Sequence, residues 1–264
     1  MDTLTNTAVI IYQMGKVGST SIHHSLEEAS LQLPIYKVHF LSDEGMAHAV
    51  EFHQKTLKIP WENTPHIQTS EFLREKIQTD PSSQWKVITL VRDPVMREVS
   101  EFFQYLHSMY PELLDEAGNI EKERAIKLLQ TRLMFYNPEK NYTCRWFDME
   151  IKGMFGLDVY AHPFDTEKGY SILQHGNVEL LILRLEDLNE NFSEAIGQFL
   201  ALESPIELIR SNVRAEQKRG STYEQVRQEL TLRESVCRKI YSSKYAQHFY
   251  SETEIERLIQ KWSG

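Results

Sequence analysis

The chain has 264 residues, a formal net charge of -9 and 41% hydrophobic residues. The acidic balance argues against nonspecific binding to nucleic acids or membrane surfaces, both of which attract basic proteins. The length and apolar content suffice for one large α/β domain, so we expect residues 1–264 to form a single domain. The only two cysteines, Cys144 and Cys237, lack the spacing of a disulfide framework or a zinc site, which indicates a reducing compartment.

The sequence gives no sign of a membrane segment or of a secretion signal. No apolar stretch approaches the roughly 20 residues that a transmembrane helix needs. The N-terminus has no basic segment before its first apolar run, as a signal peptide would have. We therefore expect a cytoplasmic protein.

Four short runs rich in Val and Ile are typical of β-strands, at residues 7–13, 35–40, 86–91 and 178–184. Helical periodicity is found between or after them, at residues 19–31, 70–78, 93–107 and 189–202. Three of the runs are nearly continuous in apolar residues, as expected of parallel strands covered on both faces. The pattern predicts an α/β fold with a parallel, doubly wound sheet flanked by helices. Weaker periodicity and many aromatic residues over roughly 107–175 predict a mostly helical insertion.

The first strand runs into the segment QMGKVGST, residues 13–20, which is followed by Ser21. A glycine-containing turn between a strand and a helix gathers backbone N–H groups at the positive end of the helix dipole, where phosphate or sulfate binds. Glycines let the backbone approach such a ligand, and lysine and hydroxyl side chains add charge and donors. The members of this candidate anion site are Gly15, Lys16, Val17, Gly18, Ser19, Thr20 and Ser21. An ordinary strand-to-helix turn with a capping serine is the alternative interpretation.

The segment VRDPVMREVS contains a second candidate anion site. Arg92 follows an apolar strand, Asp93 is a suitable N-cap and Pro94 suits the first helical position. The planar guanidinium of arginine matches phosphate, and doubly wound folds bind ligands at the carboxyl ends of their strands. Arg97 and Ser100 lie three residues apart on one face of the predicted helix. The alternative is a capped helix with solvated arginines.

Together these segments resemble the sulfotransferases that use 3′-phosphoadenosine 5′-phosphosulfate. Residues 15–20 resemble the family's 5′-phosphosulfate loop, and RDPxxRxxS matches its 3′-phosphate motif. LILRLEDL at 181–188 and QKRG at 217–220 are similar to two later elements, in the same order. The resemblance implies a P-loop-like sulfotransferase fold, with Lys16 as the loop lysine. It implies 3′-phosphate contacts from Arg92, Ser100, Lys218, Arg219 and Gly220, with Arg97 as a secondary candidate.

Two positions depart from the sulfotransferase pattern. Met14 and Gly15 replace the usual proline step, and Ser21 stands where many members carry an aromatic residue that stacks on adenine. An ATP or GTP loop fits less well, because Lys16 precedes the second glycine instead of following it. A nucleotide-binding protein without catalysis and a P-loop kinase or phosphotransferase are the alternatives to a sulfotransferase.

Sulfuryl transfer to a hydroxyl requires a base. Strand alternation places Lys37 and His39 on one face of the second predicted strand, near its carboxyl end. Histidine accepts a proton at neutral pH, and KVHFL resembles the cytosolic sulfotransferase segment whose histidine is the base and whose lysine lies in the active site. We therefore expect Lys16, Lys37 and His39 to be catalytic. Asp148 or Glu150 is the alternative base, since carbohydrate sulfotransferases often use glutamate.

We expect no metal site, because the histidines His23, His24, His48 and His53 lack HExxH spacing. The segments RWFDMEIKGMFGLDVYAHPFD and YSSKYAQHFYSETEI resemble bacterial capsular polysaccharide synthesis proteins that share the sulfotransferase core. This likeness implies a carbohydrate hydroxyl as acceptor, and the alternatives are the hydroxyls of lipids, phenols and small metabolites. The aromatic residues of these segments suit stacking on sugars, and they suit a hydrophobic core equally.

Overall fold

The computed structural model describes residues 6–64, 66–210 and 222–264. Its contacts divide the chain into two compact units, unit 1 with residues 1–91 and 146–211 and unit 2 with residues 92–145 and 212–264. No described helix is long and apolar enough to span a membrane.

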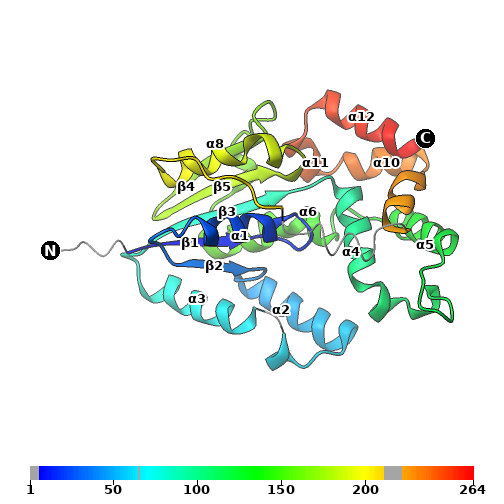
Figure 1. Cartoon of the computed structure of the whole chain (residues 1–264), viewed down its shortest axis with the longest axis horizontal. Helices are drawn as coiled ribbons and strands as arrows, with labels where there is room; N and C mark the ends of the chain where they lie inside the picture. Colours follow the sequence, from blue (N-terminus) through cyan, green and yellow to red (C-terminus); the bar gives the residue numbers. More distant parts are fainter. Residues whose placement is uncertain (1–5, 65, 211–221) are drawn as a thin grey trace. The chain divides into compact units, whose positions relative to one another are not determined.

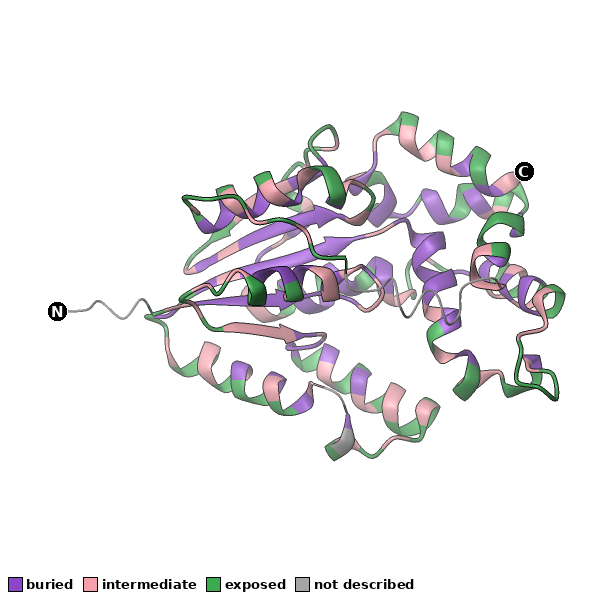
Figure 2. Cartoon of the chain, in the orientation of Figure 1, coloured by how far each residue is buried: buried purple, intermediate pink, exposed green. Residues whose placement is uncertain are grey.

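Unit 1 contains an α/β sheet with the strand order β2-β1-β3-β5-β4 (Figure 1). The strands are β1 (Thr7–Tyr12), β2 (Ile35–Val38), β3 (Gln84–Val91), β4 (Tyr170–His175) and β5 (Val178–Arg184). Strand β1 pairs in parallel with β2 and β3, and β3 pairs in parallel with β5. The inner strands β1, β3 and β5 are almost wholly buried (Figure 2), as their continuous apolar runs require. These four parallel strands confirm the four predicted strand segments.

The prediction of a wholly parallel sheet is wrong at β4, which pairs antiparallel with β5. Only Gly176 and Asn177 separate the two strands, because His175 is already paired with Val178. A two-residue connection forms a hairpin and cannot cross over to a parallel strand. The sheet is therefore mixed, and the predicted insertion ends in a strand at the edge of the sheet.

Helices flank both faces of the sheet at β2. The Tyr36 ring lies 5.8 Å from the ring of Phe72 in α3 (Ile67–Thr79), whereas Lys37 donates a hydrogen bond to Thr20 of α1 (Ser19–Glu28). Neighbouring residues of a strand point to opposite faces, so α1 and α3 cover opposite faces of this strand. The remaining helical segments of unit 1 are α2 (Asp43–Glu51), η1 (Phe52–Leu57), η2 (Trp61–Asn63), η4 (Phe147–Lys152), α7 (Gly153–Phe155), η5 (Val159–Ala161), η6 (Leu185–Asp187) and α8 (Leu188–Leu200).

Unit 2 is helical. It contains α4 (Pro94–Met109), η3 (Pro111–Leu113), α5 (Lys122–Met134), a helix at 222–229, α10 (Glu234–Tyr241), α11 (Lys244–Phe249) and α12 (Glu252–Ser263). The short helix α6 (Tyr142–Trp146) lies at the boundary of the two units in the sequence. The predicted helices at 19–31, 70–78, 93–107 and 189–202 correspond to α1, α3, α4 and α8 and are confirmed.

The first turn of α4 is fixed by Asp93. Its carboxylate accepts a hydrogen bond from the backbone N–H of Val95 at 3.0 Å, as predicted for an N-cap. It also accepts hydrogen bonds from the Tyr241 hydroxyl at 2.6 Å and from the indole N–H of Trp262 at 3.1 Å. One buried carboxylate thus connects the start of α4 with α10 and α12.

A second buried carboxylate, Glu150 of η4, connects three parts of unit 1. Its Oε2 accepts a hydrogen bond from the Tyr12 hydroxyl at the end of β1. The same oxygen accepts hydrogen bonds from the backbone N–H groups of Leu41 and Ser42, both at 3.0 Å. Burial raises the pKa of Glu150, and these hydrogen bonds act in the opposite direction. Glu150 therefore fixes the ends of both β1 and β2 relative to η4.

Glu150→Ala is expected to lower the free energy of unfolding by about 3 kcal/mol or more, because it leaves three donors without an acceptor in a buried site. Denaturant unfolding at neutral pH measures this. The matched control is Glu190→Ala at the exposed first turn of α8, which should change stability by about 1 kcal/mol at most. Equal effects of the two variants would contradict a structural role for Glu150.

Candidate functional site

The predicted anion loop lies between β1 and α1 in unit 1. Gly18 precedes the first helical residue with φ of 89°, and Lys16 also has a positive φ, of 72°. The positive φ of Gly18 favours glycine, and a Cβ there would lie 2.5 Å from a methyl carbon of Leu185, which would have to move. The backbone thus turns sharply twice within three residues. Such turns direct successive N–H groups toward one point.

The start of α1 has the character of an anion site. The first N–H groups of a helix have no acceptor one turn earlier in the helix. Here the N-cap residue Gly18 makes no side-chain cap and no acidic residue lies in the first turn, while the Ser21 N–H bonds to the Gly18 carbonyl at 3.2 Å. A strand-to-helix turn with a capping serine, the alternative interpretation, would show such a cap. Ser19 is buried, at 6% exposure, and Val17 is fully buried, so Val17 can offer a ligand only its backbone. The helix dipole and the uncapped N–H groups favour a negatively charged ligand.

Lys37 and His39 both contact the segment from Gln13 to Thr20. The Lys37 ammonium donates to Thr20 Oγ1 at 3.0 Å, and His39 Nδ1 lies 3.0 Å from the backbone oxygen of Gln13. Burial lowers the pKa of Lys37, and the Glu27 carboxylate partly opposes this effect. Burial also lowers the pKa of His39, to about 4, although the hydrogen bond to the Gln13 carbonyl acts in the opposite direction. His39 is therefore neutral at pH 7 and able to accept a proton.

His66, which no sequence motif indicated, completes this basic cluster. Its ring lies edge-on to the ring of His39, with 4.9 Å between ring centroids. It also has a positive φ, of 68°, at the start of α3. Burial lowers its pKa, and the charges of Lys37 and His23 lower it further. Non-glycine residues with this strained conformation are found preferentially at functional sites.

The two carboxylates weighed as alternative bases lie on η4 in different surroundings. Asp148 is exposed, whereas Glu150 is fully buried and accepts the three hydrogen bonds described above. The geometry of Glu150 suits a structural role.

Three side chains of α1 could approach a metal ion, His23, His24 and Glu27. They place one ligand atom each within 4.8 Å of one another, and His23 Nδ1 lies 3.2 Å from Glu27 Oε2. His24 and Glu27 are exposed, and the His23–Glu27 contact is an i,i+4 pair of the kind that stabilises isolated helices. The absence of a metal site stays a prediction.

The second predicted motif lies in unit 2, where the backbone of Arg92 is held by Tyr245 of α11. The Tyr245 hydroxyl accepts a hydrogen bond from the Arg92 N–H at 2.9 Å and donates one to its carbonyl at 3.0 Å. The position of Arg92 is thus fixed through its main chain, which leaves the direction of its side chain to be set by other contacts.

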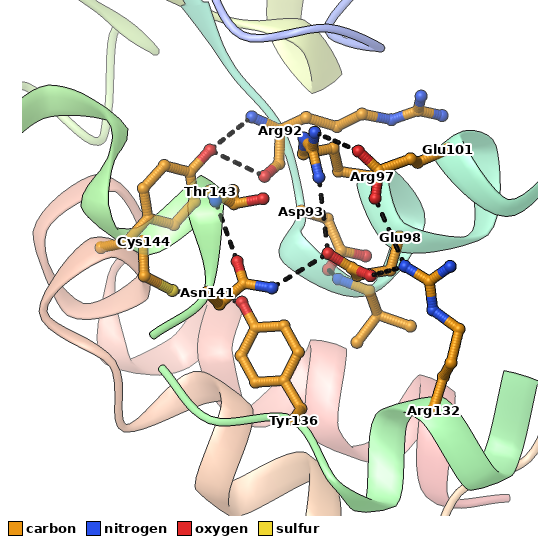
Figure 3. Close-up of polar contacts among 12 residues, drawn as sticks. Arg92, Asp93, Arg97, Glu98, Glu101, Arg132, Tyr136, Asn141, Thr143 and Cys144 are labelled. Carbon is orange, nitrogen blue, oxygen red and sulfur yellow. Dashed lines mark hydrogen bonds and ion pairs between the residues drawn. The ribbon is translucent and has the colours of Figure 1, made fainter. Parts of the chain in front are cut away.

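Arg97, the secondary candidate for the 3′-phosphate, lies in a buried ion-pair network (Figure 3). It is 2% exposed and pairs with Glu101 at 2.7 Å and Glu98 at 3.4 Å. Arg132 of α5 pairs with Glu98 at 2.9 Å, and Asn141 donates to the same carboxylate at 3.1 Å. Burial alone would lower the pKa of Arg97, but the two carboxylates outweigh it and raise the pKa. Arg97 thus belongs to a buried network on α4, which Arg132 joins to α5.

The remaining candidates for the 3′-phosphate are placed as follows. Ser100 lies on α4, one turn after Arg97, and is 9% exposed. Lys218, Arg219 and Gly220 lie outside the described residues.

Comparison with known proteins matches residues 118–251, about half of the chain, to the family described as "NKWYS: Putative capsular polysaccharide synthesis protein". The chain belongs to this family. No curated protein and no solved structure matches it. Membership confirms the predicted likeness to capsular polysaccharide synthesis proteins and indicates a biosynthetic enzyme. The matched residues include neither the loop at 13–21 nor the motif at 92–100, so the family description carries no information on a sulfuryl donor.

Arg97→Met is expected to lower the free energy of unfolding by about 3 to 5 kcal/mol, because it removes the closest cation of Glu101 and one of the two cations that pair with the buried Glu98. Arg124→Met is the matched control, since Arg124 forms an exposed pair with Glu121 on the same unit and should cost about 1 kcal/mol at most. Denaturant unfolding of both variants measures the difference. An Arg97 variant with unchanged stability and weakened nucleotide binding would show instead that Arg97 contacts the ligand.

Tyr245→Phe removes both hydrogen bonds to the main chain of Arg92 and should lower the free energy of unfolding by about 1 to 3 kcal/mol. Thermal and denaturant unfolding measure the change. Tyr36→Phe serves as the control, because the partly exposed Tyr36 hydroxyl has no protein partner within the described residues. A Tyr245 variant as stable as this control would contradict the role assigned to Tyr245.

Proposed function

We propose that the protein is a sulfotransferase, which moves a sulfuryl group from 3′-phosphoadenosine 5′-phosphosulfate to a hydroxyl of a carbohydrate. The observation that carries the proposal is the uncapped start of α1, where Lys37 already donates to Thr20 within the loop. A sulfuryl or phosphoryl group is the kind of ligand that such a helix start binds. The order of residues in the loop favours the sulfotransferase pattern over that of ATP-binding loops.

The proposed reaction gives a role to each candidate catalytic residue of unit 1. The acceptor oxygen forms a bond to sulfur while the bond between sulfur and the bridging phosphate oxygen breaks. The products are a sulfate ester, 3′-phosphoadenosine 5′-phosphate and one proton, which His39 takes. Lys16 and Lys37 stabilise the negative charge that develops on the departing phosphate oxygen. No metal is required for this chemistry.

The residues that bind the 3′-phosphate of the donor are assigned by sequence resemblance alone. By this resemblance Arg92 and Ser100 bind the 3′-phosphate, together with Lys218, Arg219 and Gly220. Among these, Arg92 has the best structural support, because Tyr245 fixes its main chain from both sides. The parallel strand order β2-β1-β3-β5, with the loop directly after β1, supports the proposal that unit 1 is a P-loop-like sulfotransferase core.

A carbohydrate acceptor is supported by the family, whose description refers to capsular polysaccharide synthesis. Polysaccharides offer many hydroxyl groups and no other nucleophile in comparable number. The proposal therefore joins a donor inferred from the loop to an acceptor inferred from the family.

Calorimetric titration with 3′-phosphoadenosine 5′-phosphate tests the donor site. Lys16→Met keeps the length of the side chain and removes its charge, and it should weaken binding by about 10- to 100-fold, the value of one hydrogen bond to a charged group. Lys55→Met is the control, because Lys55 is exposed and pairs only with Glu51 within the described residues. Absence of binding at millimolar nucleotide would reject the donor.

Transfer of label from radioactive donor to a panel of polysaccharides tests the reaction itself. Transfer should occur with the wild type and be lost in Lys16→Met. Binding of the nucleotide without transfer to any hydroxyl compound would indicate a non-catalytic nucleotide-binding protein. Magnesium-dependent turnover of ATP would indicate a phosphotransferase instead.

A further inference from the structure

Gln13 is the residue that follows β1 and precedes the anion loop, and its side chain is almost completely buried, at 1% exposure. Two of its polar atoms approach the same ring nitrogen of His39. The backbone oxygen and the side-chain Nε2 each lie 3.0 Å from His39 Nδ1. The backbone oxygen requires a hydrogen on Nδ1, whereas the amide nitrogen requires a lone pair there.

A neutral imidazole nitrogen either carries a hydrogen and donates it or has a lone pair and accepts. A carbonyl oxygen only accepts, and an amide nitrogen only donates. Both contacts of Gln13 therefore cannot be hydrogen bonds to one tautomer of His39. The backbone carbonyl cannot be reversed, since the main chain of Gln13 is held by its N–H bond to the Val38 carbonyl at 3.3 Å. The side-chain amide can exchange its two ends by a half-turn about its last carbon–carbon bond.

The half-turn also gives a donor to the oxygen of the amide. Gln13 Oε1 is buried and has no hydrogen-bond partner among the described residues. Buried polar atoms without a partner are rare, because each costs the free energy of its lost hydration. The half-turn brings Oε1 to Nδ1 of His39, where it can share the hydrogen that the backbone carbonyl also accepts. The backbone oxygen and Oε1 of Gln13 then both accept the hydrogen that His39 carries on Nδ1.

We infer that Gln13 is the positioning residue that holds His39 in the tautomer with hydrogen on Nδ1, so that Nε2 carries the lone pair that takes the proton of the acceptor hydroxyl. The inference rests on the proposed function for its catalytic meaning. In the transfer step the hydroxyl proton moves to His39 Nε2 as the acceptor oxygen bonds to sulfur. The bond from sulfur to the phosphate oxygen breaks at the same centre.

The surroundings of His39 keep its ring neutral. Burial lowers its pKa to about 4, and the electrostatic effects of His66, Lys37 and His53 act in the same direction. Among the described residues, the largest effects on the pKa of His39 include no carboxylate. The lone pair on Nε2 is therefore present at every pH above about 5. The contacts with Gln13 orient the His39 ring and so determine the direction in which this lone pair points.

Nitrogen NMR of isotope-labelled wild-type protein at pH 7 tests the tautomer directly, with the His39 signals identified by their loss in His39→Gln. A protonated Nδ1 and an unprotonated Nε2 are expected. The reverse assignment overturns the inference. This measurement needs no substrate, so it stands even if label transfer fails and the proposed function is rejected.

Gln13→Glu tests the positioning role. A carboxylate of the same shape beside Nδ1–H stabilises the imidazolium and should raise the pKa of His39 by about 1 to 3. The acidic limb of the pH profile of kcat/KM should move toward neutral pH by the same amount. Gln32→Glu, the same change at an exposed site, should leave both unchanged. A His39 pKa or an acidic limb that is equal in Gln13→Glu and Gln32→Glu overturns the inference.

Discussion

The arrangement of the candidate site depends on the buried carboxylate of Glu150. Its hydrogen bonds to the Tyr12 hydroxyl and to the N–H groups of Leu41 and Ser42 fix the ends of β1 and β2 on either side of the site. Gln13 is the next residue after Tyr12, and His39 stands two residues before Leu41. A carboxylate in this place costs desolvation, as its raised pKa shows, and it is retained where it satisfies three donors at once. The contact between Gln13 and His39 is thus a consequence of how the two strand ends are held.

The electrostatics of the site follow from burial. Lys37, His39 and His66 lie close together with Thr20 of the loop, and burial lowers the pKa of all three basic groups. His39 is neutral at pH 7 because burial lowers its pKa to about 4, and positive charge on Lys37 lowers the pKa of both histidines further. The site therefore combines positive charge for an anionic group with a neutral nitrogen that can accept a proton. General base chemistry next to a bound anion requires this combination.

The sequence predicted the features that arise from local patterns. The four apolar runs became β1, β2, β3 and β5, and Asp93 became the N-cap of α4. The strand β4 escaped prediction because its sequence, YSILQH, is only partly buried at the edge of the sheet and has no continuous apolar run. The contact of Glu150 with Tyr12 joins residues 138 positions apart, and nothing in either local pattern indicates it. The same holds for His66, which reaches His39 only because α3 begins beside β2.

The family match also bears on the two motifs that it does not include. The matched residues 118–251 contain Glu150 and Tyr245. Within unit 1, Glu150 holds the strand ends that carry Gln13 and His39, and within unit 2, Tyr245 holds the main chain of Arg92. The matched half of the chain thus supplies buried contacts, one in each unit, that hold residues of the two predicted motifs, and these motifs lie in the unmatched half. Within each unit, a predicted motif therefore depends on a buried residue that lies far from it in the sequence.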